Sequence, residues 1–330
     1  MTAARAGQGE RVSVIIPCYN QARFLSDAIE SALRQTLAPG EIIVVDDGST
    51  DYTADVAARF AEVRLLRQSN QGLAAARNRG LAAAQGDYVI LLDADDRLLL
   101  GAVEAGMQCL AARPRAAFAY GHVKLISSDG AALPTPAQIS VERDHYLKLL
   151  RNNYIWTTGV ALYRRSVFDV VGGFDSRLNA AADFDLNLRV AREFPVCCCG
   201  QAVLEYRLHD QNMSRDYAVM LKACMAALRG HRGFVSRLPR HRQAWLEGVR
   251  EVQRGYGDKL VRQVRQAWAE KHWSQAAAGT LTLLRHYPRG AVKASLPESL
   301  LRRARRLRAS RLDNQSNDEC QRAERMQVEP

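Results

Sequence analysis

The feature that most restricts the fold is a regular alternation of strand-like and helix-like segments over the first 125 residues. Val12 to Pro17 is a run of mostly β-branched residues, and the segment after Asn20 carries its apolar residues on one helical stripe. Strand patterns recur at 42–45, 63–66 and 88–92, with helical patterns between them. Repeated βα units of this length predict an α/β protein with a Rossmann-like, mostly parallel sheet flanked by helices.

The regular alternation of strand and helix patterns becomes less clear from about residue 126. Residues 127–139 are rich in Pro, Gly and Ser and predict a loop, whereas only helix-like segments follow residue 215. We therefore expect a flexible N-terminus at 1–10 and a catalytic domain at 11–215, made of halves at 11–125 and 126–215. A helical, basic C-terminal extension at 216–311 and a disordered tail at 312–330 are expected to follow.

Composition restricts the cellular context. The chain has 330 residues and is 47% hydrophobic and 25% charged, which is enough for a full core. It has no window of about 18 uncharged apolar residues, so no membrane span is expected. Met1 to Glu10 lacks an apolar signal core, so we expect a cytoplasmic protein. The cysteines show no zinc spacing, and Cys197 to Cys199 are expected in a buried strand.

The net charge of +11 is concentrated after residue 229. Six arginines between Arg302 and Arg311 form one dense run. Such a run can bind anionic lipid or nucleic acid, or remain a solvated tail.

Acidic residues cluster where one predicted strand ends. Asp93, Asp95 and Asp96 follow the apolar run from Tyr88 to Leu92. Like charges this close raise each other's pKa unless a cation lies between them, and hard divalent cations take oxygen ligands. Because ligands bind at the carboxyl ends of strands in α/β sheets, the cluster predicts a metal site that holds a phosphate. The alternative to a metal site is a capped turn after the strand, which explains Asp96 better than it explains Asp93 and Asp95.

Polar motifs follow other predicted strands in the same way. The first strand ends in Pro17-Cys18-Tyr19-Asn20, and the second ends in Asp46-Asp47-Gly48. Tyr19 could stack on a base, and an Asp could accept hydrogen bonds from a base or a ribose, although Asp46 and Asp47 could also cap the turn. Arg77, just before the carboxylate strand, could pair with an Asp or reach a phosphate.

Taken together and in this order, the motifs resemble those of the family 2 glycosyltransferases, which are inverting enzymes with the GT-A fold. The resemblance covers about residues 11–215 and includes Gly172-Gly173-Phe174-Asp175, Ala182-Asp183-Phe184-Asp185 and Tyr206-Arg207-Leu208-His209. It implies that the predicted catalytic domain is a GT-A domain. Its first half would bind the nucleotide sugar and its second half the acceptor.

The resemblance also implies roles for single residues. Nucleotide-sugar binding is expected from eight residues of these motifs: Pro17, Tyr19, Asp47, Asn20, Asp46, Arg77, Asp93 and Ala94. The first three residues in this list are expected to lie near the base. Asp93 is expected near the ribose. Asp95 is expected on Mn²⁺ or Mg²⁺, with His209 as a second metal ligand or a diphosphate contact.

Asp183 matches the family's catalytic base, and Ala182 replaces the Glu that usually precedes it. Asp185 is an alternative base. The implied reaction is metal-dependent, inverting transfer of a sugar from a nucleotide-diphosphate sugar, with UDP favoured, to a sugar or lipid-linked acceptor hydroxyl. The rival function is a nucleotide-sugar-binding or scaffold protein with impaired catalysis, which Ala182 favours.

Two other enzyme classes fit the first strand less well. Nucleotidyltransferases and dinucleotide-binding dehydrogenases need a Gly-rich loop there, which Pro17-Cys18-Tyr19-Asn20-Gln21 does not provide. Nucleic acid is not expected as a partner. The C-terminal helices carry Trp245, Trp268 and Trp273 among basic residues. They could lie on an anionic membrane at the inner face, or pack as a helical cap on the catalytic domain or another subunit.

Overall fold

The structure is a computed structural model that describes residues 11–178 and 180–296. The chain divides into two compact units, one ending at Val252 and the other beginning at Gln253. The predicted flexible N-terminus, the dense arginine run and the predicted tail at 312–330 lie outside the described residues. The predicted functional boundary near residue 215 lies within the first unit and stays a prediction.

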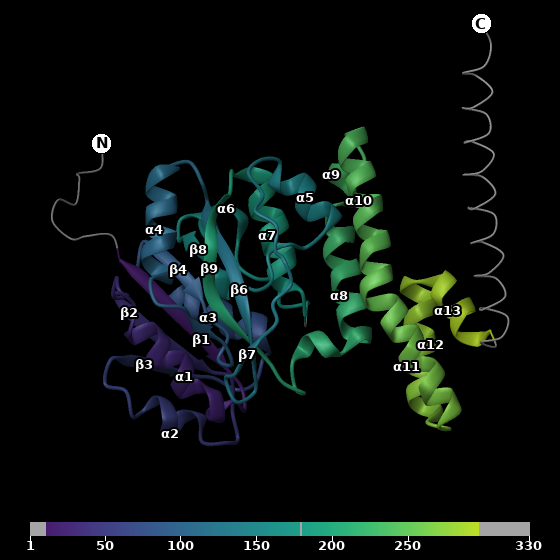
Figure 1. Ribbon diagram of the computed structural model, residues 1–330, viewed down its shortest axis with the longest axis horizontal. Helices are drawn as coiled ribbons and strands as arrows, with labels where there is room; N and C mark the ends of the chain where they lie inside the picture. The colour runs from purple at the N-terminus through teal and green to yellow at the C-terminus, as the bar shows by residue number, and fades with distance from the viewer. Residues whose placement is uncertain (1–10, 179, 297–330) are drawn as a thin grey trace, which may run out of the picture. The chain divides into compact units, whose positions relative to one another are not determined.

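One mixed sheet organises the first unit (Figure 1). In the described residues it has nine strands, in the order β3-β2-β1-β4-β8-β6-β9-β5, with β7 paired to β6. Their bounds are β1 (Val12–Cys18), β2 (Glu41–Asp46), β3 (Val63–Arg67), β4 (Tyr88–Leu91), β5 (Arg97–Leu98), β6 (Phe118–Ser127), β7 (Ala132–Leu133), β8 (Ala161–Arg164) and β9 (Cys197–Leu208).

Strand direction determines where the functional residues meet. The strands β1 to β4 pair in parallel, as the βα alternation predicts. The strand β8 is antiparallel to both β4 and β6, and β9 is parallel to β6. Two reversals restore the original direction, so β9 runs the same way as β4. The carboxyl ends of β1, β2, β4 and β9 therefore open at one edge of the sheet.

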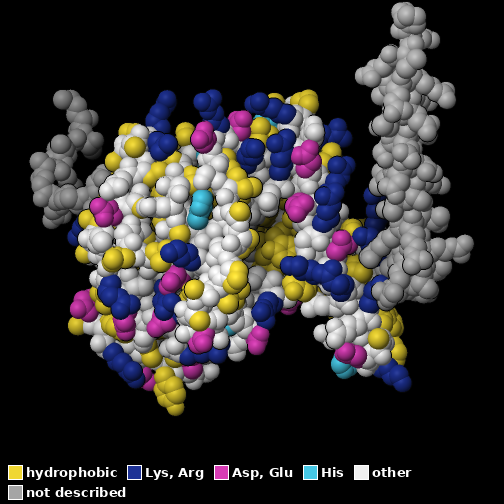
Figure 2. All heavy atoms as spheres, in the orientation of Figure 1, with side chains coloured by type: hydrophobic (Ala, Val, Ile, Leu, Met, Phe, Trp, Pro, Cys, Tyr) yellow, Lys and Arg dark blue, Asp and Glu magenta, His cyan; other side chains and the backbone are white. Residues whose placement is uncertain are grey.

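Helices cover the sheet of the first unit and continue beyond its last strand (Figure 1). Their bounds are α1 (Ala22–Leu33), α2 (Thr53–Ala57), α3 (Leu73–Ala83), α4 (Ala102–Ala112), α5 (His145–Arg151), α6 (Val167–Val171), α7 (Ala182–Glu193), α8 (Tyr217–Gly230), α9 (Arg232–Val235) and α10 (Pro239–Val252). Basic side chains gather over α9 and α10 (Figure 2). The expected α/β class with a helical C-terminal region is confirmed.

Two glycines permit close packing in this unit. A Cβ on Gly80 of α3 would lie 2.3 Å from Cγ2 of Ile15, so α3 lies directly on β1. A Cβ on Gly248 of α10 would lie 1.8 Å from the carbonyl oxygen of Leu150. The two helices α10 and α5 therefore touch backbone to backbone at Gly248, which ties α10 to the first unit.

Some local predictions were wrong. The helical pattern between the strands at 42–45 and 63–66 forms only the short α2, and the expected loop at 127–139 contains β7. Residues Gln253–Gly257, at the start of the second unit, form a π-helical turn that contains Gly255 and Gly257. Such a turn has i→i+5 hydrogen bonds and is rare in proteins.

The second unit continues from that turn as three helices, α11 (Asp258–Ala269), α12 (Trp273–His286) and α13 (Pro288–Ser295). Val264 of α11 packs on Gly279 of α12, where a Cβ would come within 2.4 Å of the Val264 side chain. In the described part of the chain, no helix is both long and apolar enough to cross a membrane.

Candidate active site

A pocket of about 470 Å³ lies at the carboxyl edge described above. Its volume is in the range typical of small-molecule sites. Among its lining residues are the strand-end residues Pro17, Tyr19, Asp47, Asp93, Ala94 and Asp95. Other parts of the wall come from residues 70–72 with the first turn of α3, from Ser176 and Leu178, and from Tyr206 with residues 211–214. Six predicted binding residues from three different strands therefore meet in one cavity.

Asp47 holds one wall of this pocket in place. Its carboxylate accepts hydrogen bonds from the backbone N–H groups of Gln71 and Gly72, at 2.9 and 2.8 Å, and from the Gln68 side chain at 2.7 Å. Gly72 has a φ of +89°, in the region that favours glycine. Across the pocket, Tyr19 is 47% exposed, so its ring is free to stack on a planar ligand.

Asp93 connects the pocket to a buried charge. Oδ1 of Asp93 accepts from Nη2 of Arg77 at 2.6 Å, and Oδ2 accepts from the Thr157 hydroxyl at 3.1 Å. Arg77 is buried and its guanidinium stacks on Phe174, 5.2 Å from the ring centroid. Arg77 does not line the pocket, so it orients Asp93 from behind.

Asp95 and His209 meet although they are 114 positions apart in the sequence. Oδ2 of Asp95 lies 2.9 Å from Nε2 of His209, because β4 and β9 end at the same edge. Neighbouring ligands on an octahedral Mg²⁺ lie about 2.9 Å apart, given metal–oxygen distances of about 2.0–2.1 Å. The spacing of this pair therefore suits two ligands of one cation. In the described residues, no group of three or more His, Cys, Asp or Glu side chains is placed to hold a metal ion.

The hydrogen bonds of His209 define its tautomer. The backbone N–H of Gln211 donates to Nδ1 of His209 at 3.2 Å, so the proton of the neutral ring is on Nε2 and is donated to Asp95. A metal ligand must present an unprotonated nitrogen. His209 can therefore bind a cation through Nε2 only after Gln211 releases Nδ1, whereas Asp95 can do so directly.

Arg207 holds the backbone beside the Asp95 and His209 pair in place. Its buried guanidinium donates to the carbonyl of Asp95 at 2.8 Å, to the carbonyl of Ser128 at 3.0 Å and to the Asp27 carboxylate at 2.6 Å. It also lies over the ring of Phe24, 4.8 Å from its centroid. Arg207 thus fixes the backbone position of the residue expected to bind the cation. The sequence placed it in a motif but assigned it no role.

The expectation that Asp96 caps the next helix was wrong. That helix, α4, begins at Ala102, with Gly101 before it. Asp96 is buried and accepts from the backbone N–H of Arg207 at 2.9 Å, so it joins the end of β4 to β9. Burial raises the pKa of Asp96 well above its usual range, and the negative charges of Asp95 and Asp93 raise it further.

Asp183 lies in the first turn of α7, beside the ion pair of Asp93 and the buried Arg77. Burial raises the pKa of Asp183, the positive charge of Arg77 lowers it, and Asp93 raises it. Asp183 is not among the residues that line the pocket. The alternative base, Asp185, is already paired with Arg189 at 2.8 Å.

A second cleft, of about 590 Å³, lies beyond the 173–178 segment. Phe174, Asp185, Arg189 and Arg192 are among its lining residues, and Leu178 lines both cavities. The segment between them is clamped by Asn78, whose side chain donates to the carbonyl of Phe174 at 2.8 Å and accepts its N–H at 2.7 Å.

Two further predicted binding residues lie outside the pocket lining. The side-chain oxygen of Asn20 accepts from the backbone N–H of Thr50 at 2.8 Å. Asp46 accepts from the N–H of Ser49 at 2.9 Å and pairs with Arg67 at 3.2 Å. Both shape the turns behind the pocket, and their roles in nucleotide binding stay predictions.

Comparison with known proteins identifies the family. Residues 13–172 match the sequence profile of glycosyl transferase family 2. These residues belong to this family. An uncharacterized glycosyltransferase, EpsJ of Bacillus subtilis, is 32% identical over 193 residues, which are 55% of this chain and 56% of that protein. The chain spans about half or less of the length of the first curated relatives it matches.

Solved structures agree on the fold. The Staphylococcus aureus TarS fragment 1–349 in complex with UDP has a TM-score of 0.56 and 17% identity, over 83% of this chain and 81% of that one. The mannosyltransferase PcManGT of Pyrobaculum calidifontis, in complex with GDP-Man and Mn²⁺, has a TM-score of 0.54 and 18% identity, over 86% and 87%. At these identities the similarity shows that this family member has the same fold.

Proposed function

We propose that this family 2 protein is an inverting glycosyltransferase. It would transfer a sugar from a nucleotide-diphosphate sugar to an acceptor hydroxyl in glycan or glycolipid biosynthesis, in the cytoplasm. The observation that carries the proposal is the single pocket in which Tyr19, Asp47, Asp93 and Asp95 meet. Structures of TarS with UDP and of PcManGT with GDP-Man support a nucleotide sugar as donor.

On the donor side, the exposed ring of Tyr19 would stack on the base, with UDP favoured. Asp47 would act mainly through the loop it anchors, because its oxygens already accept three hydrogen bonds. Asp93 keeps one oxygen on Arg77 and the other on Thr157, which orients the carboxylate for a ribose hydroxyl.

A divalent cation, Mn²⁺ or Mg²⁺, would be held by Asp95, by His209 once Nδ1 is released, and by the diphosphate itself. The 2.9 Å spacing of the pair fits this assignment, and the PcManGT complex contains Mn²⁺. When bound, the cation would neutralise charge on the leaving diphosphate. Arg207 would keep Asp95 in position through the hydrogen bond to its carbonyl.

The catalytic base would be Asp183. It would accept the proton of the acceptor hydroxyl, which attacks the anomeric carbon from the face opposite the diphosphate. Arg77 supports this role because its charge opposes the rise in the Asp183 pKa and so favours the ionised carboxylate. Asp185 is the weaker candidate because its carboxylate is already paired with Arg189.

The test is nucleotide-sugar binding followed by turnover, on the full chain. UDP and GDP sugars with Mn²⁺ are screened by thermal unfolding. A ligand present at 100 times its Kd stabilises the native state by about 2.7 kcal/mol. For a unit of this size that corresponds to a rise of about 5–11 °C in Tm. Asp95→Asn should lose the Mn²⁺-dependent part, whereas Asp210→Asn, an exposed matched control, should keep it. No stabilisation by any nucleotide sugar would overturn the donor assignment.

The second candidate is a nucleotide-sugar-binding protein that has lost catalysis. Two observations favour it: Ala182 replaces the family's Glu, and Asp183 does not line the donor pocket. Release of nucleoside diphosphate distinguishes the two functions. Binding without release, across a panel of acceptors, would support the scaffold.

A further inference from the structure

An apolar stripe lies along the exposed side of α12. It consists of Trp273, Ala277, Leu281 and Leu284, which fall within about 80° of the helix circumference at 3.6 residues per turn. Trp273, Leu281 and Leu284 are 57%, 67% and 55% exposed. We call these four residues the α12 stripe. No charged residue lies within it.

The stripe is separate from the face that α12 uses for folding. The buried residues of α12, Ala276, Gly279, Leu283 and His286, occupy the opposite side of the helix. The second unit therefore completes its own core without the stripe. Contiguous exposed apolar surface of this kind marks an interaction site.

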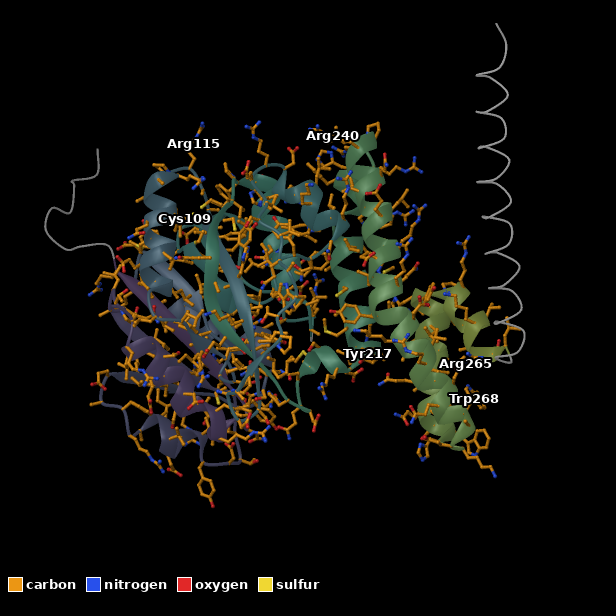
Figure 3. All side chains as sticks on the ribbon, viewed as in Figure 1. Cys109, Arg115, Tyr217, Arg240, Arg265 and Trp268 are labelled. Atoms are coloured by element: carbon orange, nitrogen blue, oxygen red, sulfur yellow. The ribbon has the colours of Figure 1, made fainter. Side chains whose placement is uncertain are left out.

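A tryptophan pair lies at one end of the stripe. Trp268 projects from the end of α11 (Figure 3), and its ring contacts that of Trp273 edge to face with the centroids 5.5 Å apart. Both rings are exposed. Tryptophan is enriched at the headgroup level of membranes, where one side of its ring is apolar and its N–H remains hydrated.

The second unit, which carries the stripe, is strongly basic. Residues 253–296 contain eight Lys and Arg against two Asp and Glu, a net charge of +6. Both acidic side chains are paired, Asp258 with Lys293 at 2.9 Å and Glu270 with His272 at 3.4 Å. Arg285 flanks the stripe on α12 and is exposed.

We infer that the α12 stripe, with Trp268, docks this protein on the surface of an anionic lipid membrane. The apolar side chains would enter the boundary between headgroups and acyl chains, and the surrounding cations would contact lipid phosphates. The inference deepens the proposed function, because a lipid-linked acceptor would then be concentrated at the same surface.

Charge favours a lipid surface over a second copy of the chain. Two copies that met through this stripe would bring two units of net charge +6 together. Like charges at contact distance repel, because they lie within the screening length of about 8–10 Å at ordinary ionic strength. An anionic bilayer presents the opposite charge and an apolar interior to the same surface.

The test is vesicle co-sedimentation of the full chain. Vesicles contain phosphatidylglycerol and phosphatidylcholine in equal parts, or phosphatidylcholine alone. The wild-type chain should bind the anionic vesicles and not the neutral ones. The double variant Leu281→Ser/Leu284→Ser should bind at least about tenfold more weakly, because it loses the apolar part of the contact. Leu100→Ser, an equally exposed leucine of the first unit, is the matched control and should bind like the wild type.

Three further measurements make the outcomes decisive. The double variant should keep the Tm of the wild type, and a large fall would mean that the stripe is packed inside the protein. Light scattering should give the same mass for both, and a dimer lost in the variant would assign the stripe to self-association. Wild-type binding by the double variant would also overturn the inference. Nucleotide-sugar binding is measured on the same samples, so failure of the docking surface is distinguishable from failure of the proposed function.

Discussion

Arg207 offers the sharpest test of how this site is built. Replacement by Gln removes a buried guanidinium that donates to the carbonyls of Asp95 and Ser128 and to the Asp27 carboxylate. A buried acceptor left without a partner costs about 1–3 kcal/mol, and breaking a buried ion pair costs about 3–5 kcal/mol. Because Asp27 is partly exposed and can be solvated, the lower part of that range applies. We expect a loss of about 3–4 kcal/mol in the free energy of unfolding.

The matched control is Arg97→Gln. Arg97 approaches the same Asp27 at 3.7 Å and pairs with Glu205 at 2.8 Å, but its side chain is considerably more exposed than that of Arg207. Pairs of this kind contribute about 0–1 kcal/mol. Urea unfolding of both variants gives the difference directly. In thermal unfolding, Arg207→Gln should lower the Tm by roughly 6–16 °C, at about 2–4 °C per kcal/mol.

The functional part of the prediction concerns Asp95. With Arg207 shortened, the carbonyl of Asp95 loses its hydrogen bond, so the Mn²⁺-dependent part of nucleotide binding should weaken more than the metal-independent part. Equal stability losses in the Arg207 and Arg97 variants would refute the reasoning. So would an Arg207 variant of low stability that still binds nucleotide with full dependence on Mn²⁺.

Further predictions concern the base, its charge partner, the histidine and the α10 contact. Asp183→Asn should lower sugar transfer by about 10²–10⁴-fold while donor affinity, measured by calorimetry, changes little; full transfer would remove Asp183 from the mechanism. Because burial raises the Asp183 pKa and a base must be ionised, transfer should decline on acidification at a higher pH than for an ordinary Asp. Arg77→Met should move this decline to still higher pH in a pH–rate profile; an unchanged profile would refute the coupling. His209→Ala should reduce Mn²⁺ affinity in a metal titration. An unchanged affinity would mean that, of Asp95 and His209, only Asp95 binds the metal. Gly248→Ala should lower stability by about 1–3 kcal/mol, because the added Cβ meets the Leu150 carbonyl; no change in urea unfolding would show that α10 can shift without cost.

The parts of the fold that the sequence predicts best are those defined by local periodicity. Runs of apolar residues located β1 to β4 to within a few residues, because each element forms from neighbouring residues. The strand β6 was missed, since its pairing with β9 depends on residues about 80 positions away.

The candidate site also contains residues that local motifs predict and residues that act only through distant partners. Pro17, Tyr19, Asp47, Asp93, Ala94 and Asp95 were predicted from strand-end motifs, and they line one pocket. The supporting contacts of Thr157, Asp27 and Asn78 were not predicted, since each is an ordinary polar residue that acts only through a distant partner. Asp96 was misassigned for the same reason, because its partner is a backbone N–H of β9.

The direction of β9 has a consequence for how the protein is made. The first half of the chain supplies most of the pocket, yet Arg207 and His209, which fix and pair with Asp95, follow more than a hundred residues later. During synthesis Arg77 emerges from the ribosome before Asp93, its partner, but the donors to Asp95 and Asp96 follow much later. Until residue 209 has emerged, Asp95 and Asp96 lie close together without the backbone and side-chain donors of Arg207 and His209. The segment 11–125 is thus an unfinished site rather than an independent module, because the two residues that fix and pair with Asp95 lie outside it.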